Sequence, residues 1–372
     1  MDFTIQKDEF IKGLSRVQSI IEKRTTLPIL SNVLLETRDN ALQVVGTDLE
    51  VGIKGRCEAS FKKKRLADGS GQKLFEIVRE MPDGEIHFKT VEGNYAQITG
   101  GHVRFKIAGI APDDYPILPD YQDESFFPLP VEDLADMLDK VIHAVGSDET
   151  RPYLNGVYFH TADAEGKKRL RAVATDGHRL ALCDKALPDG SKFAVKPGVI
   201  LPRKGVLELK KLLDGSADDL EICVSERNAI FRLGTTLVII RLVDGDYPDY
   251  NTVIPKGNEK VITCSRDDLF AALRRVSLLT EDLGRGVRFS LRKKMIEVSC
   301  ENPNLGEAHE EMAVSYDAED FDIGFNARYF LDALGVVRDE DVNLSFGDAF
   351  SPVLLKTPSD SGFLSVLMPM RL

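Results

Sequence analysis

The sequence predicts an α+β protein made of three repeated domains, each with two helices packed on mostly antiparallel sheets. The first observation is a repeated turn, since Asp-Tyr-Pro occurs at 114–116 and again at 246–248, each time after an apolar run. Proline removes a backbone donor and aspartate favours tight turns, so both copies are expected to end a strand. About as many residues follow the second copy as separate the two, which predicts three copies of one unit.

The second observation is the chain length of 372 residues, which is more than one ordinary hydrophobic core holds. The third is the order of predicted elements, which repeats as helix, strands, helix and strands. We therefore expect three domains at 1–127, 128–256 and 257–372.

The first domain begins with a helix whose apolar residues Phe10, Leu14, Val17 and Ile21 share one face. Its predicted helices are 7–23 and 72–81, and its predicted strands are 29–37, 41–47, 49–54, 85–90, 95–99 and 103–110. The segment 60–71 interrupts the pattern, because it is predicted to be a basic loop where the repeat requires a strand before the second helix.

The second and third domains repeat this order of elements. In the second, helices are predicted at 131–145 and 204–213 and strands at 156–160, 170–174, 179–182, 220–224, 229–233 and 236–242. In the third, helices are predicted at 266–279 and 326–337 and strands at 287–291, 295–300, 310–316, 342–346, 353–356 and 362–368.

Charge is unevenly distributed along the chain. The formal net charge of −12, taken alone, argues against a nucleic-acid binder. The first helix nevertheless carries Lys12 and Arg16 on one face, and acidic residues concentrate in loops. Basic residues recur on helices of the other two domains: Lys204, Lys210, Lys211, Arg266, Arg274 and Arg275. A single basic helix is explained by a face exposed to solvent. Basic residues on helices of all three domains instead favour helices that face a polyanion, because a basic surface attracts phosphates without contacting the bases.

The segment Asp176-Gly177-His178-Arg179 is the most enzyme-like part of the sequence, because a carboxylate and an imidazole could serve acid–base catalysis. Thr175-Asp176, however, matches Thr47-Asp48 in the first domain, where no histidine follows. We therefore interpret both as turns in which aspartate caps local backbone donors. Since no zinc spacing, phosphate-binding loop or nucleophile elbow is found, the sequence favours a binding protein without catalytic residues, metals or cofactors over an enzyme.

The compartment is predicted from cysteine usage and hydropathy. The five cysteines are scattered and form no CxxC pair, which predicts reduced thiols and a cytoplasmic protein. No apolar run approaches the roughly 20 residues of a membrane span.

Six motifs together carry a resemblance that covers nearly the whole chain. They are TLPIL at 26–30, GTDLE at 46–50, YLNG at 153–156, ATDGHRLA at 174–181, PRKGV at 202–206 and MPMRL at 368–372. In these residues the chain resembles the bacterial DNA sliding clamp family, the beta subunit of DNA polymerase III. The resemblance implies a DNA clamp fold, a ring-forming homodimer around duplex DNA without sequence preference, and a non-catalytic processivity factor in DNA replication. It also implies partners that bind through short peptide motifs: the replicative polymerase alpha subunit, the clamp loader, and other polymerases and repair proteins.

The resemblance also implies three sets of site residues. The DNA-binding set is Arg24, Arg151, Tyr153, Lys12, Arg16 and Lys204. The partner-peptide pocket is Leu154, Thr175, Gly177, His178, Arg179, Leu180, Pro248, Val253, Val366, Met368, Pro369, Met370 and Arg371. The dimer interface is Arg104, Phe105 and Lys106 of one copy against Leu278, Leu279, Glu301 and Glu307 of the other.

Two features limit these expectations. In the DNA-contacting loop, relatives carry a glutamine and an adjacent aromatic pair, whereas this sequence has Asp148 and Pro152 beside Tyr153, which argues against a strong contact there. The basic loop 62–65 has no assigned role. The alternative to a clamp is a peptide-binding adaptor that never closes on DNA.

Overall fold

The computed structural model describes residues 1–21, 27–38, 40–63, 67–110, 112–119, 121, 124–164, 166–188, 190–280 and 286–371. The chain divides into two compact units. The first unit is Met1–Leu134 with Lys204–Leu242, and the second is Ala135–Arg203 with Val243–Leu372. The middle third of the chain thus contributes to both units.

One motif recurs six times along the described chain: a short strand leads directly into a helix, and three strands follow. The helices are α1 Lys7–Gln18, α2 Gly71–Glu80, α3 Val131–Ile142, α4 Arg203–Leu213, α5 Arg266–Val276 and α6 Ala327–Gly335. The predicted three-domain α+β fold is therefore confirmed, and each domain consists of two similar halves.

The first unit contains two antiparallel sheets. The five-stranded sheet has the order β5 Ser60–Lys63, β1 Asp2–Gln6, β7 Glu85–Val91, β8 Tyr95–Gly100 and β9 Val103–Ala108. The eight-stranded sheet has the order β10 Phe127–Leu129, β15 Leu220–Val224, β16 Asn228–Leu233, β17 Thr236–Arg241, β4 Val51–Cys57, β3 Ala41–Thr47, β2 Asn32–Arg38 and β6 Ala67–Ser70. In this larger sheet β17 pairs with β4, which joins strands of the first and second predicted domains.

The second unit also contains two antiparallel sheets. Its eight-stranded sheet has the order β14 Val199–Pro202, β11 Gly156–Ala164, β12 Lys167–Thr175, β13 Arg179–Ala186, β25 Phe363–Leu367, β24 Val353–Lys356, β23 Asp341–Phe346 and β18 Lys260–Ser265. Its four-stranded sheet has the order β21 Gly306–Ala313, β20 Met295–Asn302, β19 Gly286–Arg292 and β22 Phe321–Asn326. Here β13 pairs with β25, so strands of the second and third predicted domains share one sheet.

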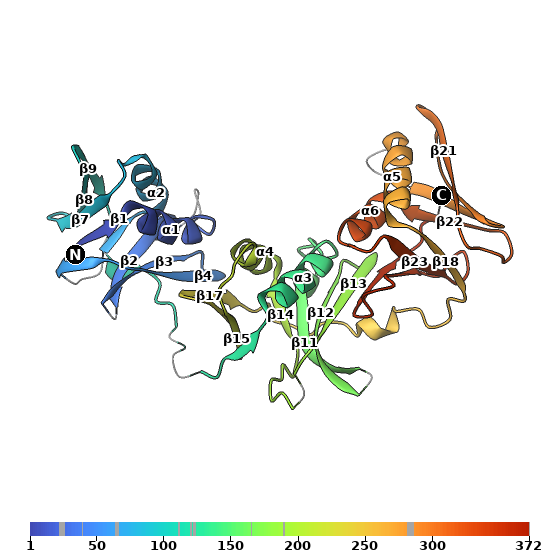
Figure 1. Ribbon diagram of the computed structural model, residues 1–372, viewed down its shortest axis with the longest axis horizontal. Helices are drawn as coiled ribbons and strands as arrows, with labels where there is room; N and C mark the ends of the chain where they lie inside the picture. The colour runs from blue at the N-terminus through green and yellow to red at the C-terminus, as the bar shows by residue number, and fades with distance from the viewer. Residues whose placement is uncertain are drawn as a thin grey trace. The chain divides into compact units, whose positions relative to one another are not determined.

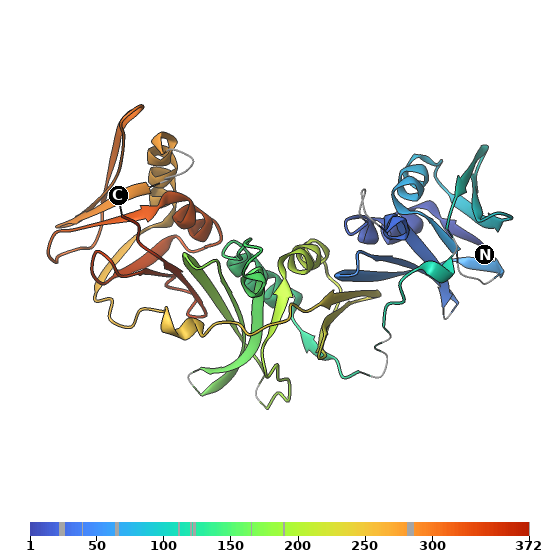
Figure 2. The same ribbon diagram turned by 180° about the vertical axis from the view of Figure 1, so that it is seen from behind.

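Helices pack in pairs against these sheets. In the first unit α1 and α2 lie side by side over the strands, and in the second unit α5 and α6 do the same, as both views show (Figures 1 and 2). Amphipathic spacing explains the packing, because Phe10, Leu14 and Val17 of α1 are fully buried. The start of α5 is fixed by Ser265, whose hydroxyl accepts the Asp268 N–H at 3.2 Å.

The structure corrects three predictions of local structure. The segment 60–71 is not a loop throughout: β5 and β6 form there, and residues 64–66 lie outside the described chain. Backbone pairing with β1 and β2 creates these strands, and edge strands tolerate polar residues that hide them from sequence patterns. The short strands before the other helices were also missed, because each has only three to six residues and so offers little periodic pattern. Predicted helices also end early, since α1 stops at Gln18 and α3 at Ile142, while the end of the predicted 266–279 helix is the 3-10 turn η5 Ser277–Leu279.

Candidate nucleic-acid and partner-binding sites

The strand-ending turns after β3 and β12 have the same hydrogen bonds. Thr47 Oγ1 donates to the Val51 carbonyl at 2.9 Å, and Asp48 Oδ1 accepts the Val51 N–H at 2.7 Å. In the second copy, Thr175 Oγ1 donates to the Arg179 carbonyl at 2.7 Å. Asp176 Oδ1 there accepts the N–H groups of His178 and Arg179 at 2.9 and 3.0 Å.

This match confirms the interpretation of Thr-Asp as a capping turn. The Asp176 carboxylate is committed to backbone donors and to Arg179 Nε, at 3.0 Å, rather than to the imidazole two residues away. The turn also shows how the two copies differ, because the left-handed position is Leu49, at φ 77°, in one and Gly177, at φ 91°, in the other. A Cβ on Gly177 would lie 3.0 Å from Arg151 Nη1, so glycine keeps this second turn open.

The basic helix residues differ in how far they are neutralised. Lys12 of α1 is exposed and Arg16 is half-buried on the same helix. Lys204 of α4 instead lies 2.5 Å from a buried Asp48 oxygen, so its charge is already matched within the first unit. Arg24 lies outside the described residues.

Ion pairs also hold other basic residues of these helices. In α4, Lys211 Nζ lies 2.7 Å from Glu208 Oε1, and in α5, Arg275 Nε donates to Glu310 Oε2 at 2.8 Å. The basic faces predicted from sequence are therefore partly neutralised within the chain.

The predicted DNA-contacting loop is ordered by Asp148. Its Oδ1 accepts the hydroxyl and N–H of Thr150 at 2.7 and 2.9 Å, and its Oδ2 accepts Arg151 Nε at 2.9 Å. These bonds, led by the Thr150 hydroxyl and N–H, lower the Asp148 pKa to about 2. Arg151 is thus paired with the Asp148 carboxylate, while Tyr153 lies in the following 3-10 turn η3 Pro152–Leu154.

A pocket of about 220 Å³ in the second unit brings together most of the predicted peptide-site residues. Nine of them line it: Leu154, Thr175, Gly177, Arg179, Leu180, Pro248, Val253, Val366 and Met368. They come from η3, the turn between β12 and β13, the segment after β17, and β25 with its tail. Val253 and Met368 are 46% and 40% exposed, which is unusual for apolar side chains in one pocket and leaves its mouth open to a ligand.

Four predicted residues lie beside this pocket rather than in its lining: His178, Pro369, Met370 and Arg371. The tail that carries the last three is anchored, because the Met368 N–H donates to the His178 carbonyl at 3.0 Å and the Met370 N–H donates to the Gly324 carbonyl at 2.9 Å. The tail therefore has a fixed position in the second unit.

An arginine fixes one edge of the pocket. Arg179 Nη1 donates to Asp332 Oδ2 of α6 at 2.6 Å, in addition to its bond with Asp176. Its guanidinium lies 4.6 Å from the centre of the Tyr329 ring. Since the arginine is held by two carboxylates and a ring, it offers a rigid polar rim.

Three pocket residues were missed by sequence reasoning: Asp249, Tyr250 and Thr252. The Tyr250 hydroxyl accepts Arg171 Nη1 at 3.1 Å and lies 2.9 Å from His160 Nε2. Arg171 is itself bonded to Asp184 at 2.7 and 2.6 Å. We call Asp184, Arg171, Tyr250 and His160 the Tyr250 network.

The Tyr250 network fixes the segment that follows β17 onto the sheet. Tyr247, from the Asp-Tyr-Pro turn, stacks on Tyr158 with ring centres 4.7 Å apart and planes at 4°. The sequence shows the two tyrosines Tyr247 and Tyr250 in this segment, but their spacing does not identify their partners.

The predicted dimer residues lie on two edges. Arg104, Phe105 and Lys106 are exposed on β9, the last strand of its sheet, in the first unit. In the second unit Asn302 Nδ2 donates to the Leu279 carbonyl at 2.9 Å, which ties η5 to the β20–β21 hairpin. Glu301 and Glu307 stand opposite each other on that hairpin.

The one cluster of metal-ligand types found among the described residues is Asp136, Cys183 and Asp360. Lys140 Nζ lies 2.7 Å from Asp136 and 2.6 Å from Asp360, and Lys185 Nζ lies 2.6 Å from Asp136. Because two ammonium groups already neutralise both carboxylates, this cluster is a set of ion pairs rather than a metal site. No helix of the described chain is both long and apolar enough to cross a bilayer.

Comparison with known proteins identifies the family. Three family models match successive parts of the chain: the N-terminal domain of the DNA polymerase III beta subunit at 1–119, the central domain at 128–249 and the C-terminal domain at 251–371. The beta sliding clamp of Caulobacter vibrioides is 36% identical over 373 residues and that of Escherichia coli K12 is 34% identical over 373 residues, each covering 100% of both chains. The crystal structure of the Caulobacter crescentus DNA polymerase sliding clamp is 36% identical, covers 100% of both chains and superimposes with a TM-score of 0.94.

The chain belongs to the DNA polymerase III beta subunit family, the bacterial sliding clamps. The expected DNA clamp fold and the expected function as a non-catalytic processivity factor in DNA replication are thereby confirmed.

Proposed function

We propose that two copies of this chain close head to tail into a ring around duplex DNA and hold replicative polymerase and other partners on it, in the bacterial cytoplasm. Each copy would form half of the ring. One third of that half would come from each of its domains, 1–127, 128–256 and 257–372. The proposal rests on a rule for which strands pair at the junctions within the two eight-stranded sheets.

In both eight-stranded sheets, the last strand of one half-domain pairs antiparallel with the last strand of another. β17 pairs with β4 in the first unit, and β13 pairs with β25 in the second. The smaller sheets end on the equivalent strands, β9 in the first unit and β21 in the second. Applied to two copies, the rule pairs β9 of one chain with β21 of the other, and because each copy offers both edges, two such contacts close a ring.

Charge supports this pairing. The β9 edge presents Arg104 and Lys106, whereas Glu301 and Glu307 of the β20–β21 hairpin are exposed and directly opposite each other. Like charges that lie opposite each other on a sheet repel, so cations from a second copy would relieve this repulsion. Phe105 and Leu278, which are 37% and 78% exposed, supply apolar area for the same contact.

DNA would be held by enclosure and by weak phosphate contacts. Lys12, Arg16 and Arg24 are the proposed contacts in the first domain, and Arg151, Tyr153 and Lys204 those in the second. Since Lys204 and Arg151 already pair with carboxylates, their contacts with phosphate would be weak and readily exchanged. Sliding requires such contacts, and enclosure explains why a chain with a net charge of −12 can act on DNA.

Partners would bind through short apolar peptide segments seated in the pocket of the second unit. The replicative polymerase alpha subunit, the clamp loader, other polymerases and repair proteins are the proposed occupants. Leu154, Leu180, Val366 and the flexible Met368 provide an adaptable apolar lining, and Arg179, with His178 beside it, provides polar contacts at the edge.

Retention on DNA tests the ring. The protein is loaded onto nicked circular DNA with its clamp loader and ATP, isolated by gel filtration, and half of the sample is linearised. A closed ring stays on circles and runs off linear ends. Equal loss from circular and linear DNA after verified loading would instead favour an adaptor that binds partner peptides without enclosing DNA.

A further inference from the structure

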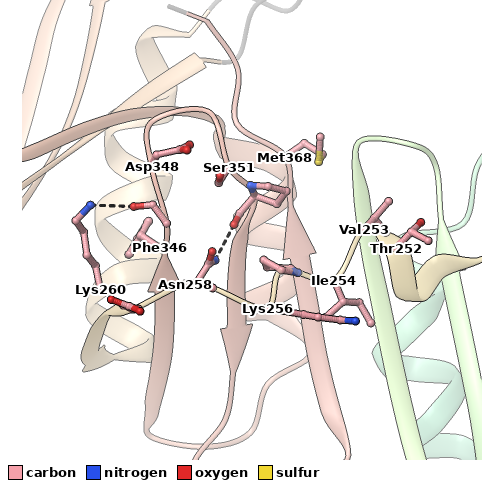
Figure 3. A pocket seen from close by; sticks show the side chains of 15 residues that line it. Thr252, Val253, Ile254, Lys256, Asn258, Lys260, Phe346, Asp348, Ser351 and Met368 are labelled. Atoms are coloured by element: carbon pink, nitrogen blue, oxygen red, sulfur yellow. Dashed lines mark hydrogen bonds between the residues drawn. The ribbon is translucent and has the colours of Figure 1, made fainter.

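A second and larger cleft adjoins the peptide pocket in the same unit. Its volume is about 620 Å³, and it shares Thr252, Val253 and Met368 with the pocket. One wall is the irregular segment 252–260, and the other is the β23–β24 loop, with Phe346, Gly347, Asp348, Ser351 and Pro352 (Figure 3). We call this space the linker cleft.

The two walls of the linker cleft are fixed to each other. Asn258 Nδ2 donates to the carbonyls of Ser345 and Pro352, both at 2.8 Å, and so bridges the two sides of the loop. Lys260 Nζ donates to the Gly347 carbonyl at 2.9 Å. Figure 3 shows the bonds from Asn258 to Pro352 and from Lys260 to Gly347, so the shape of the cleft is set by the protein itself before any ligand arrives.

Of the four charged side chains that line the linker cleft, Lys256 and Glu259 are exposed, whereas Asp348 and Lys260 are already occupied. Asp348 Oδ1 accepts the Phe350 N–H at 2.9 Å, and this bond, with those from Ser351, lowers the Asp348 pKa. Lys260 is bound to Gly347 and lies 4.8 Å from the centre of the Phe321 ring. Neither side chain is available to a ligand without breaking these contacts.

Lys256 differs from both of these. It is exposed, and among the described residues no ion pair or hydrogen bond engages its ammonium group. Figure 3 shows its amine on the same side of the linker cleft as Ile254 and Val253, which also lines the peptide pocket. Within the described chain, the backbone of 254–257 makes no hydrogen bond to other backbone groups, so it can pair with an extended ligand.

We propose that the linker cleft is a second subsite for partner peptides, which takes acidic residues flanking the apolar segment in the pocket and places a carboxylate against Lys256. The proposal rests on the proposed function of the pocket. Continuity favours a peptide as the occupant, because Met368 and Val253 face both spaces and a single extended chain can cross between them. Lys256 would attract an acidic residue that flanks the apolar segment, and the backbone groups of 254–257 would hydrogen-bond to a peptide in extended conformation.

Two synthetic peptides test the proposal on the full-length protein. Both contain the apolar clamp-binding segment of the polymerase alpha subunit from the same bacterium, extended at each end by two aspartates in one and by two asparagines in the other. Affinities are measured by fluorescence anisotropy at low and high salt. We expect the aspartate peptide to bind about threefold more tightly at low salt, and the advantage to vanish at high salt, because exposed ion pairs are weak and screened.

Protein variants separate the linker cleft from a general effect of charge. Lys256→Gln should remove the preference for aspartate, and Lys256→Glu should reverse it. Lys192→Glu is the matched control, since Lys192 is exposed in the same unit and lines neither space, and it should leave the preference intact.

The outcomes distinguish this inference from the proposed function. If both peptides bind wild-type protein equally and Lys256→Glu changes neither, the second subsite is wrong while the pocket stands. If Lys192→Glu has the same effect as Lys256→Glu, the preference reflects net charge and the subsite is again wrong. If neither peptide binds, the proposed pocket fails and the subsite fails with it.

Discussion

At the scale of single residues, His143 is a half-buried histidine whose two ring nitrogens are buried. Both of its ring nitrogens are shielded from solvent and make no hydrogen bond among the described residues. Burial, followed by the charge of Arg179, lowers the His143 pKa from 6.5 to about 4. The unfolded chain therefore binds a proton at this histidine more readily than the folded chain does. The contribution of neutral His143 to the unfolding free energy is fully present above pH 6.5 and is lost as pH falls toward 4.

Replacing His143 should therefore reduce sensitivity to acid. The native protein is expected to lose about 2 kcal/mol more unfolding free energy between pH 7.5 and 5.0 than the His143→Phe variant, since one pKa unit corresponds to about 1.4 kcal/mol. Urea unfolding at both pH values measures the difference. His102→Phe, which replaces an exposed histidine, is the control, and equal losses in the native protein and the His143→Phe variant would contradict the prediction.

Tyr250 is the residue through which the pocket is attached to its sheet. The Tyr250→Phe variant removes the hydroxyl that bonds Arg171 and His160, so the segment 247–253 loses its fixed position. We expect partner-peptide affinity to fall about fivefold and the unfolding free energy to fall by about 1 to 2 kcal/mol. Tyr316→Phe removes a hydroxyl that bonds the Glu319 carbonyl away from the pocket, and it should lower stability without weakening the peptide complex. Peptide anisotropy beside urea unfolding separates the two effects.

Asp148 restrains the proposed DNA contact of Arg151. In the Asp148→Asn variant the ion pair at 2.9 Å is lost and one negative charge is removed from the loop. We expect binding to short duplex DNA to tighten by about threefold at low salt, with a steeper salt dependence, because Arg151 becomes available to phosphate. Asp163→Asn, on the β11–β12 hairpin, removes the same charge elsewhere and should change little. A variant that binds DNA as weakly as the native protein would show that Arg151 does not face it.

At the scale of elements, the C-terminal tail contributes Met368 to the lining of the pocket. Its backbone is bonded to His178 and Gly324, and Met368 lines both the pocket and the linker cleft. Deletion of 368–372 should abolish partner-peptide binding, by at least 50-fold, and leave dimerisation unchanged, because β9 and β21 are intact. Peptide anisotropy and sedimentation velocity on the same sample test both statements. Unchanged peptide binding would remove the tail from the proposed site.

At the scale of the whole molecule, assembly should depend on complementary charge between β9 and the β20–β21 hairpin. The double variant Glu301→Lys/Glu307→Lys, and separately Arg104→Glu/Lys106→Glu, should each weaken the dimer by about tenfold or more. Combining all four reversals restores complementarity and should recover much of the affinity. Sedimentation velocity over a dilution series measures each dimer.

An unrelated exposed ion pair provides the control for this assembly test. Reversal of Lys293 and Asp317, which lie 3.1 Å apart, should leave the dimer unaffected. Dimers that are equally tight in all variants would exclude the proposed seam.

Much of this architecture could be predicted from the sequence, because repetition is visible in local chemistry. The two Asp-Tyr-Pro turns, the matched Thr47-Asp48 and Thr175-Asp176 turns and the amphipathic helices are set by residues close in sequence. The family resemblance located nine of the residues that line the pocket, six of them within its motifs.

The remaining features depend on contacts between distant residues. The short strands before each helix are held by pairing with strands from other parts of the chain, and their three to six residues are too few for a clear periodic pattern. The spacing of basic residues along a helix does not show that Lys204 is neutralised by Asp48, because the two residues are far apart in sequence. The Tyr250 network and the linker cleft likewise join segments far apart in the chain. Residues close in sequence are enough to predict the repeat, the helices and the capping turns. Which charges stay unpaired and where a ligand fits follow only from the folded chain, because both depend on the groups that folding places beside each residue.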